Sequence, residues 1–287
     1  MSDSLTRRGF LGGMAATAGA LSLLSEAGAA PGPIPEGENG LPLLDLHVHL
    51  DNSTIDKALE IAKERGVMFG IVEHAGTKEN KYPTVLSNDD ELGRYIEMLE
   101  GKPVYKGVQA EWTDWMGCFS KPMLARLDYV MTDAMTFPAP DGHRMKLWEK
   151  GSDIGDPKDF MDRFVDWHIA IMTNEPLDML VNVSWLPEPF AQDFDALWTE
   201  ARMAKVIETA VKYEIAIEIS SSFKLPKLPF LKMAKAAGLK FAFGSNGRYP
   251  YMGKLDYSLE MAKELGLKPP DMFLPAPEGR KAVQRRT

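Results

Sequence analysis

The chain has 287 residues, 45% hydrophobic and 26% charged, with a formal net charge of -8. That composition is typical of a folded globular protein and excludes a mainly disordered or collagen-like chain. Basic residues form no stripe before the last few positions, so we expect no nucleic-acid partner. A single cysteine, Cys118, excludes an intramolecular disulfide and a cysteine-rich zinc site.

The first thirty residues predict an export signal. Arg7 and Arg8 precede a short run from Gly12 to Leu24 that is rich in Gly and Ala, and small residues follow at 27–29. This is the pattern of a twin-arginine signal peptide. The apolar run is shorter than the roughly 20 residues that cross a bilayer, so we expect no stable membrane anchor. The sequence therefore predicts the twin-arginine export machinery as a partner and a periplasmic or otherwise extracytoplasmic location.

The rest of the chain alternates predicted strands and helices. A loop rich in Pro and Gly covers 31–42, and we expect one domain over 43–287. The predicted strands are 43–49, 67–72, 103–110, 127–132, 177–183, 215–219 and 239–243. Ser53 is the expected cap of the first helix, which Gly66 ends; a second helix carries Leu92 to Leu99, and the others cover 157–174, 195–212, 229–237 and 255–265. Regular alternation of this kind favours the α/β class, with a parallel sheet closed or nearly closed into a barrel.

Polar side chains collect where the predicted strands end. Three of the five histidines lie at the tips of the first two strands. The residues concerned are His47, His49, Glu73, His74, Glu111 and the run Ser245-Asn246-Gly247-Arg248. The carboxyl ends of parallel strands meet at one mouth of a barrel, which is where chemistry is expected. Imidazoles and carboxylates in such a place predict a zinc, manganese or iron site.

At these residues the chain resembles PHP (polymerase and histidinol phosphatase) domains. The resemblance begins with Asp-Leu-His-Val-His-Leu at 45–50 and Gly-Ile-Val-Glu-His-Ala-Gly at 70–76. It continues through the segments 108–111, 128–130, 216–220 and 244–246, so that it spans about residues 43–267. It implies a distorted (β/α)7 barrel of the TIM-barrel-like PHP type. It also implies metal-dependent hydrolysis, usually of phosphate esters, with up to three metal ions.

The resemblance assigns ligand positions, and the chain departs from some of them. His47, His49 and His74 fit metal-ligand positions, Glu111 fits the bridging carboxylate, and Glu73 stands where the family has Asp. Met135 stands where the family has a later histidine, and either Ser184 or Trp185 stands at the next such position. The closing Asp-x-His of the family is Asn246-Gly247-Arg248 here. We therefore expect a reduced site of one or two divalent ions, with His47, His49, Glu111 and Asn246 as ligands.

The remaining candidates concern the substrate. Arg248 cannot ligate a metal, so we expect it to grip an anionic group, with an ordinary surface arginine as the alternative. Glu73 or His74 is expected to orient water or a second ion. Trp112 and Trp185 either line a pocket or pack, and Glu218 either lies near the site or ends its strand. His168 shares a helical face with apolar residues and is expected to be packed.

The resulting hypothesis is a metal-dependent, phosphoesterase-like hydrolase that acts on a small anionic substrate. The missing ligands keep open a non-catalytic ligand-binding protein on a degenerate PHP barrel. An amidohydrolase such as a deaminase is a weaker alternative, because the His-Ala-Gly segment of deaminases lies on a middle strand and here it lies on the second strand. An eight-stranded barrel would favour that alternative.

Overall fold

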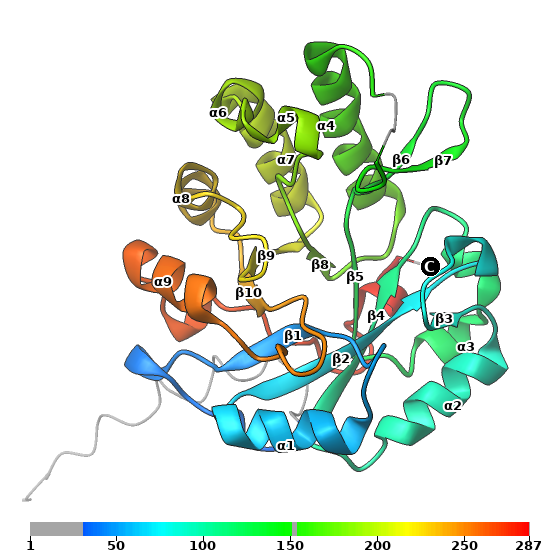
Figure 1. Ribbon diagram of the computed structural model, residues 1–287. Coiled ribbons are helices and arrows are strands. Elements are labelled where there is room, and N and C mark those ends of the chain that lie inside the picture. Colours follow the sequence, from blue (N-terminus) through cyan, green and yellow to red (C-terminus); the bar gives the residue numbers. More distant parts are fainter. Residues whose placement is uncertain (1–30, 151–153, 287) are drawn as a thin grey trace, which may run out of the picture.

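Seven parallel strands close into a barrel (Figure 1). The computed structural model describes residues 31–150 and 154–286, so the predicted signal at 1–30 lies outside the described residues. The strands are β1 (Leu44–Val48), β2 (Met68–Ala75), β4 (Val104–Ala110), β5 (Tyr129–Thr132), β8 (Met179–Leu180), β9 (Ala216–Ser220) and β10 (Phe241–Gly244). Their order is β1-β10-β9-β8-β5-β4-β2, and β2 pairs again with β1; the short β3 (Val85–Leu86) adds to β2. The predicted distorted seven-stranded barrel is confirmed.

The inside of the barrel is filled by side chains. Leu46, Val72, Tyr129 and Met131 belong to one buried cluster within it. The Tyr129 hydroxyl donates to the Leu46 carbonyl oxygen at 2.7 Å. A β-carbon at Gly107 would lie 2.4 Å from the Tyr129 ring, so a glycine is needed where this large ring crosses the barrel. Strands buried on both faces are typical of parallel sheets.

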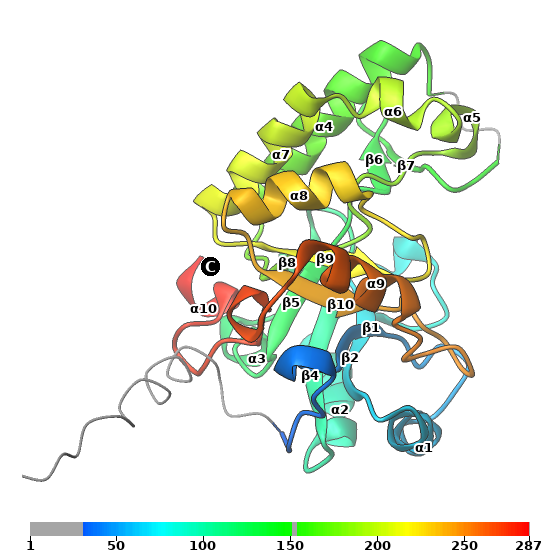
Figure 2. The ribbon, with the colours of Figure 1, turned by 90° about the vertical axis from the view of Figure 1, so that its left-hand side faces the viewer.

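Helices surround the barrel, and those of eight or more residues follow the predicted pattern closely. They are α1 (Ile55–Arg65), α2 (Asp89–Leu99), α4 (Pro157–Asn174), α7 (Glu200–Lys212), α8 (Leu228–Ala236) and α9 (Asp256–Leu265). Short helices are α3 (Lys121–Leu124), α5 (Glu188–Ala191), α6 (Phe194–Leu197) and α10 (Ala282–Arg285), with 3-10 turns η1 (Glu38–Gly40), η2 (Lys78–Asn80), η3 (Trp115–Cys118) and η4 (Pro269–Asp271). Figure 2 shows α4, α7 and α8 stacked along one side. None of the described helices is both long and apolar enough to cross a membrane.

Three local predictions were wrong. The cap of α1 is Thr54 rather than Ser53, because the Thr54 hydroxyl oxygen accepts the Lys57 backbone N–H. The predicted strand 177–183 pairs only as Met179–Leu180, since Asn182 and Ser184 take the left-handed conformation. The predicted helix 195–212 is two helices, because the backbone leaves the helical region at Trp198.

A hairpin in the connection between β5 and α4 was not predicted. It pairs β6 (Thr136–Pro138) with β7 (Arg144–Lys146) in antiparallel fashion and lies beside α4 (Figure 1). A proline inside one strand and strands of three residues give no alternating pattern that would predict it. The predicted loop 31–42 contains η1 and one bridge between Glu36 and Pro42, and the division of the chain at residues 30 and 42 stays a prediction.

Candidate metal centre

Three side chains converge at the mouth of the barrel. His49 and Asp51 follow β1, and His74 lies near the end of β2. One ligand atom from each lies within 4.8 Å of the other two. The rings of His49 and His74 are stacked, with centroids 4.7 Å apart. The sequence predicted both histidines as site residues and missed Asp51, which lies beyond the end of β1 in the loop before α1.

Several polar atoms of this cluster are buried without a partner. Within the described parts of the chain, both ring nitrogens of His49, Nε2 of His74 and Oδ1 of Asp51 accept or donate no hydrogen bond. Such a group costs about 1–3 kcal/mol when left unsatisfied, so four in one place are unusual. Two imidazoles and a carboxylate are a donor set that zinc, manganese and iron accept. The residues present therefore fit a divalent ion.

Burial also keeps the two imidazoles neutral. It lowers the pKa of His49 well below its ordinary range, and His74, Arg248 and His47 nearby add to the effect. Burial lowers the pKa of His74 to about 3. A metal binds the deprotonated nitrogen, so both rings are in the state that ligation requires near neutral pH.

Glu111 lies behind His74. The carboxylate follows β4, and its Oε1 accepts the hydrogen on His74 Nδ1 at 2.8 Å. The Tyr82 hydroxyl donates to the other oxygen, Oε2, at 3.3 Å. Burial raises the pKa of Glu111 to about 8 in the metal-free chain, so the ionised form that accepts the Nδ1 hydrogen predominates above that pH. A carboxylate on one ring nitrogen is the usual way to orient a metal-binding histidine, so the structure places Glu111 as a support of His74.

Arg248 connects Asp51 to the loop after β10. Its Nε donates to Asp51 Oδ2 at 2.9 Å, and Nη1 donates to the carbonyl oxygen and to Oδ1 of Asn246 at 3.1 and 2.7 Å. Asn246, a predicted ligand, therefore has its amide oxygen engaged by Arg248. The Arg248 side chain is 36% exposed, while that of Asp51 is 9% exposed. Arg248 thus reaches from solvent to the group of His49, Asp51 and His74 that could hold a metal ion (the metal cluster).

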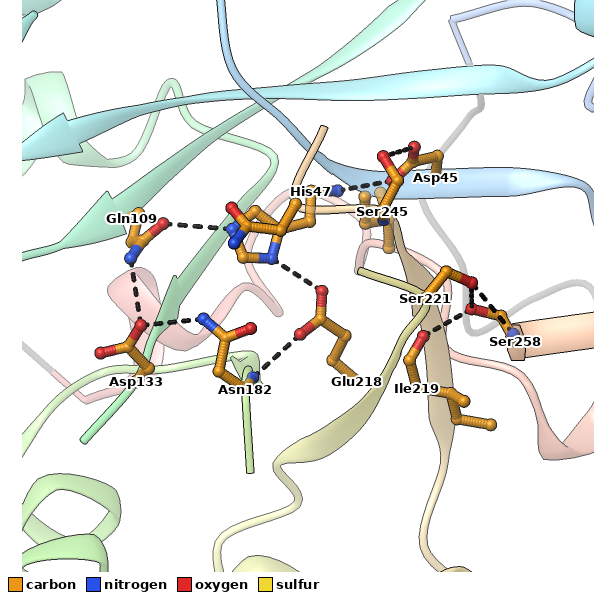
Figure 3. Close-up of polar contacts among 12 residues, drawn as sticks. Asp45, His47, Gln109, Asp133, Asn182, Glu218, Ile219, Ser221, Ser245 and Ser258 are labelled. Carbon is orange, nitrogen blue, oxygen red and sulfur yellow. Dashed lines mark hydrogen bonds and ion pairs between the residues drawn. The ribbon is translucent and has the colours of Figure 1, made fainter. Parts of the chain in front are cut away.

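His47 lies in a separate ring of hydrogen bonds (Figure 3). Its Nδ1 contacts Glu218 Oε1 at 2.7 Å and its Nε2 contacts Gln109 Oε1 at 3.2 Å. Gln109 Nε2 and Asn182 Nδ2 both donate to Asp133 Oδ2, and the Asn182 backbone N–H donates to Glu218 Oε2. Both His47 nitrogens have hydrogen-bond partners, so neither belongs to the unpartnered ligand atoms found among the described residues. The sequence predicted His47 and Glu218 as site residues but not that they bind each other.

The other predicted residues lie around this centre. Glu73 accepts the Leu50 backbone N–H at 3.3 Å, and its Oε2 is buried without a partner among the described residues. Burial, with Asp51 nearby, raises the pKa of Glu73 to about 8. Trp112 packs on Trp167, with ring centroids 5.5 Å apart. Trp185 lines a cavity of about 370 Å³ away from these contacts, together with Trp148 and Pro187.

Two larger cavities flank the strand ends. One of about 580 Å³ is lined by Leu50 and Glu73 and by apolar side chains of the segment 83–86. The other, of about 730 Å³, lies between residues 79–81 and the β6–β7 hairpin. Both have the size of a small-molecule site.

Comparisons with known proteins support the fold and not an activity. No family model matches the chain, and no curated protein does. A histidinol phosphate phosphatase from Lactococcus lactis subsp. lactis Il1403, solved with zinc, L-histidinol and phosphate, aligns with a TM-score of 0.57 and 13% identity over 84% of this chain and 97% of its own. The YdjI aldolase from Escherichia coli K12 aligns with a TM-score of 0.38 and 12% identity, over 79% of this chain and 74% of its own. A dihydropyrimidinase from Brevibacillus agri NCHU1002 aligns with the same TM-score and identity, over 88% of this chain and 64% of its own. Both similarities are too weak to support an inference about this chain. The fold of this chain is PHP-like.

Proposed function

We propose that this protein is a metal-dependent hydrolase that acts on a small anionic substrate, in the manner of a phosphoesterase. The observation that carries the proposal is the cluster of buried, unpartnered ligand atoms on His49, Asp51 and His74. It lies at the mouth of a PHP-like barrel, where the strand ends of such folds carry their chemistry.

His49, Asp51 and His74 are the residues that would hold the ion, with zinc, manganese and iron as candidates and one or two ions per chain. When bound, a divalent ion supplies a Lewis acid that makes water acidic near neutral pH and stabilises negative charge on a phosphoryl oxygen. In its ionised form Glu111 accepts the Nδ1 hydrogen of His74, which would leave Nε2 to the ion. Arg248 holds Asp51 through the oxygen Oδ2, which leaves Oδ1.

Arg248 is also the residue we propose to bind the anion. Among the described residues, its Nε and Nη1 are engaged and Nη2 has no hydrogen-bond partner. A guanidinium group is planar, always charged and suited to phosphate or carboxylate oxygens. The substrate class rests on this cation beside the metal cluster, and the phosphate in the related phosphatase is consistent with it.

Glu73 is the group we propose to orient water. Its Oε1 is fixed by the Leu50 backbone, and its Oε2 is available. It also lines the cavity of about 580 Å³, where the organic part of a substrate can lie.

We further propose, from residues 1–30 alone, that the protein is exported by the twin-arginine machinery to the periplasm.

The test is metal analysis of the purified protein, followed by assays on a panel of phosphate mono- and diesters with and without chelator. The proposal predicts bound metal and at least one ester whose hydrolysis the chelator abolishes. Full loss of metal with no change in any hydrolysis would count against it.

A second candidate function is ligand binding without turnover on a degenerate PHP barrel. The engagement of His47 by Glu218 and Gln109 favours it, because a position that the resemblance assigns to a ligand is used for internal hydrogen bonds. Tight binding of an organic anion by metal-free protein, with no turnover, would support it. The barrel closes with seven strands, so the eight-stranded fold that would favour an amidohydrolase is not present in the described residues.

A further inference from the structure

Tyr82 extends the stack of imidazoles at the metal cluster. It lies in the segment between β2 and β3, and its ring lies flat on that of His74, with centroids 3.6 Å apart and an interplanar angle of 6°. His74 in turn stacks on His49. The three rings form one column, with the fully buried His49 at one end and the partly exposed Tyr82 at the other.

The same tyrosine holds the carboxylate that orients His74. Its hydroxyl donates to Glu111 Oε2, while Glu111 Oε1 accepts from His74 Nδ1. Tyr82 thus contacts the ring through its face and the partner of the ring through its hydroxyl. A tilt of the His74 ring out of its plane would break the stack, and a flip about its Cβ–Cγ bond would break the hydrogen bond to Glu111.

The β6–β7 hairpin fixes Tyr82 in place. Lys146 Nζ lies 4.8 Å from the Tyr82 ring centroid and donates to the Asn80 carbonyl oxygen at 2.6 Å. Arg144 Nη1 donates to Thr77 Oγ1 and Asn80 Oδ1 at 3.0 and 3.2 Å. The segment 77–82 is therefore tied at several points to a hairpin that the barrel itself does not require.

We infer that Tyr82 is a positioning residue of the metal centre, which holds the His74 ring so that Nε2 faces His49 and Asp51. The inference rests on the proposed function, because it assigns His74 as a ligand. Support of a ligand by groups behind it changes metal affinity by about 10–100-fold in other proteins.

The first test measures the zinc dissociation constant by competition with a chelating dye. We expect Tyr82→Leu to weaken binding by about tenfold or more, since it removes both contacts. Tyr82→Phe keeps the stack and loses only the hydroxyl, so we expect roughly a twofold to tenfold loss. Tyr213→Leu is the matched control, because Tyr213 is also partly exposed with cations over its ring, and we expect no change.

The second test uses metal-free protein, so it stands apart from the proposed function. Long-range ¹H–¹⁵N spectra at alkaline pH report which nitrogen of His74 carries the hydrogen. We expect Nδ1–H alone in the unmodified protein and in Tyr82→Phe, and a mixture in Tyr82→Leu. The inference would be overturned if Tyr82→Leu had an unchanged His74 spectrum, or if Tyr82→Leu bound zinc with an affinity within twofold of the unmodified protein. If the unmodified protein showed Nδ1–H alone and Tyr82→Leu a mixture, but neither bound metal, the proposed function would be rejected. Tyr82 would then still hold the His74 ring in place.

Discussion

Burial decides the chemical state of the residues at the metal cluster. Burial disfavours the charged imidazolium relative to the neutral ring, which is why the pKa of His49 and of His74 is depressed. Asp51 keeps an ionised partner in Arg248, so one carboxylate oxygen is compensated and the other remains open. The cluster therefore offers two neutral imidazole nitrogens and one carboxylate oxygen to an ion. Arg248 is the residue that joins this cluster to solvent.

The role of Arg248 is testable at the residue level. Because a charge-assisted hydrogen bond contributes about 1.5–3 kcal/mol, we expect Arg248→Gln to raise KM for an anionic ester by about tenfold or more. The measurement is steady-state kinetics with metal content determined in parallel. Arg280→Gln, at an exposed arginine near the C-terminal end, is the control. An unchanged KM in Arg248→Gln at full metal content would remove Arg248 from substrate binding.

At the scale of elements, the loop that follows β1 carries His49 and Asp51 and passes directly into α1. Thr54 begins that helix by accepting the Lys57 backbone N–H, with Asp56 in the first turn. Both features stabilise the partial positive charge of a helix start. The beginning of α1 therefore fixes the end of the ligand loop, and its cap contributes to stability rather than to chemistry.

The cap gives a direct stability prediction. We expect Thr54→Ala to lower the free energy of unfolding by about 1 kcal/mol, because the Lys57 N–H loses its acceptor. Ser53→Ala is the matched control and should change it by less than about 0.5 kcal/mol. Urea denaturation followed by circular dichroism checks both. Equal losses in the two variants, or a larger loss in Ser53→Ala, would show that the cap is not Thr54.

Helix α4 carries a buried histidine that predicts a pH dependence of stability. His168 Nδ1 donates to the Phe164 carbonyl oxygen at 2.7 Å, and burial lowers the pKa of His168 from 6.5 to about 4. The unfolded chain binds this proton more readily, so the contribution is fully present above pH 6.5 and is lost as the pH falls toward 4. These values correspond to a loss of about 2 kcal/mol between neutral pH and about pH 5.

Comparison of variants isolates that contribution. His168→Asn keeps a donor for the Phe164 carbonyl but does not titrate, so its stability should fall by about 2 kcal/mol less over the same interval. His143→Asn, at an exposed histidine, should follow the unmodified protein. The measurement is the free energy of unfolding in urea at both pH values. Parallel losses in all three proteins would contradict a buried neutral His168.

At the scale of the whole molecule, the side chains inside a closed barrel must fit the space that its strands enclose. Tyr129 crosses that interior and is fixed by its bond to Leu46, while Gly70 and Gly107 leave room for the ring. Closure brings the ends of β1, β2, β4 and β10 to one mouth, which is what places the metal cluster. The packing of the barrel interior is thus a condition for the site.

This close packing predicts that adding one methyl group at Gly107 lowers the free energy of unfolding strongly. Gly107→Ala places a β-carbon 2.4 Å from the Tyr129 ring, which cannot move without losing its hydrogen bond. We expect a loss of about 1–3 kcal/mol or more in the free energy of unfolding. Gly117→Ala, where no heavy atom lies within 4 Å, is the control. A neutral Gly107→Ala, measured by thermal and urea denaturation, would contradict this packing.

Much of the fold followed from the sequence because strand–helix alternation is a local pattern. The boundaries of α1, α4 and β9 agree with the predicted ranges to within two residues. The site was harder to predict from the sequence, because the position of a residue along a strand does not indicate which side chains it contacts across the barrel. His47 and Glu218 are 171 residues apart, and their hydrogen bond has no local signal. Asp51 and Tyr82 lie in loops, where no periodicity indicates the direction of a side chain.

The most direct test of the proposed metal centre is the metal content of the purified protein and of three variants, measured by elemental mass spectrometry. The proposed metal centre predicts bound zinc, manganese or iron in the unmodified protein, and loss of that metal in His49→Gln and His74→Gln. His47→Gln should retain the metal, because both nitrogens of that ring already face Glu218 and Gln109. An unmodified protein without metal, or a site that survives His49→Gln and is lost in His47→Gln, would contradict it.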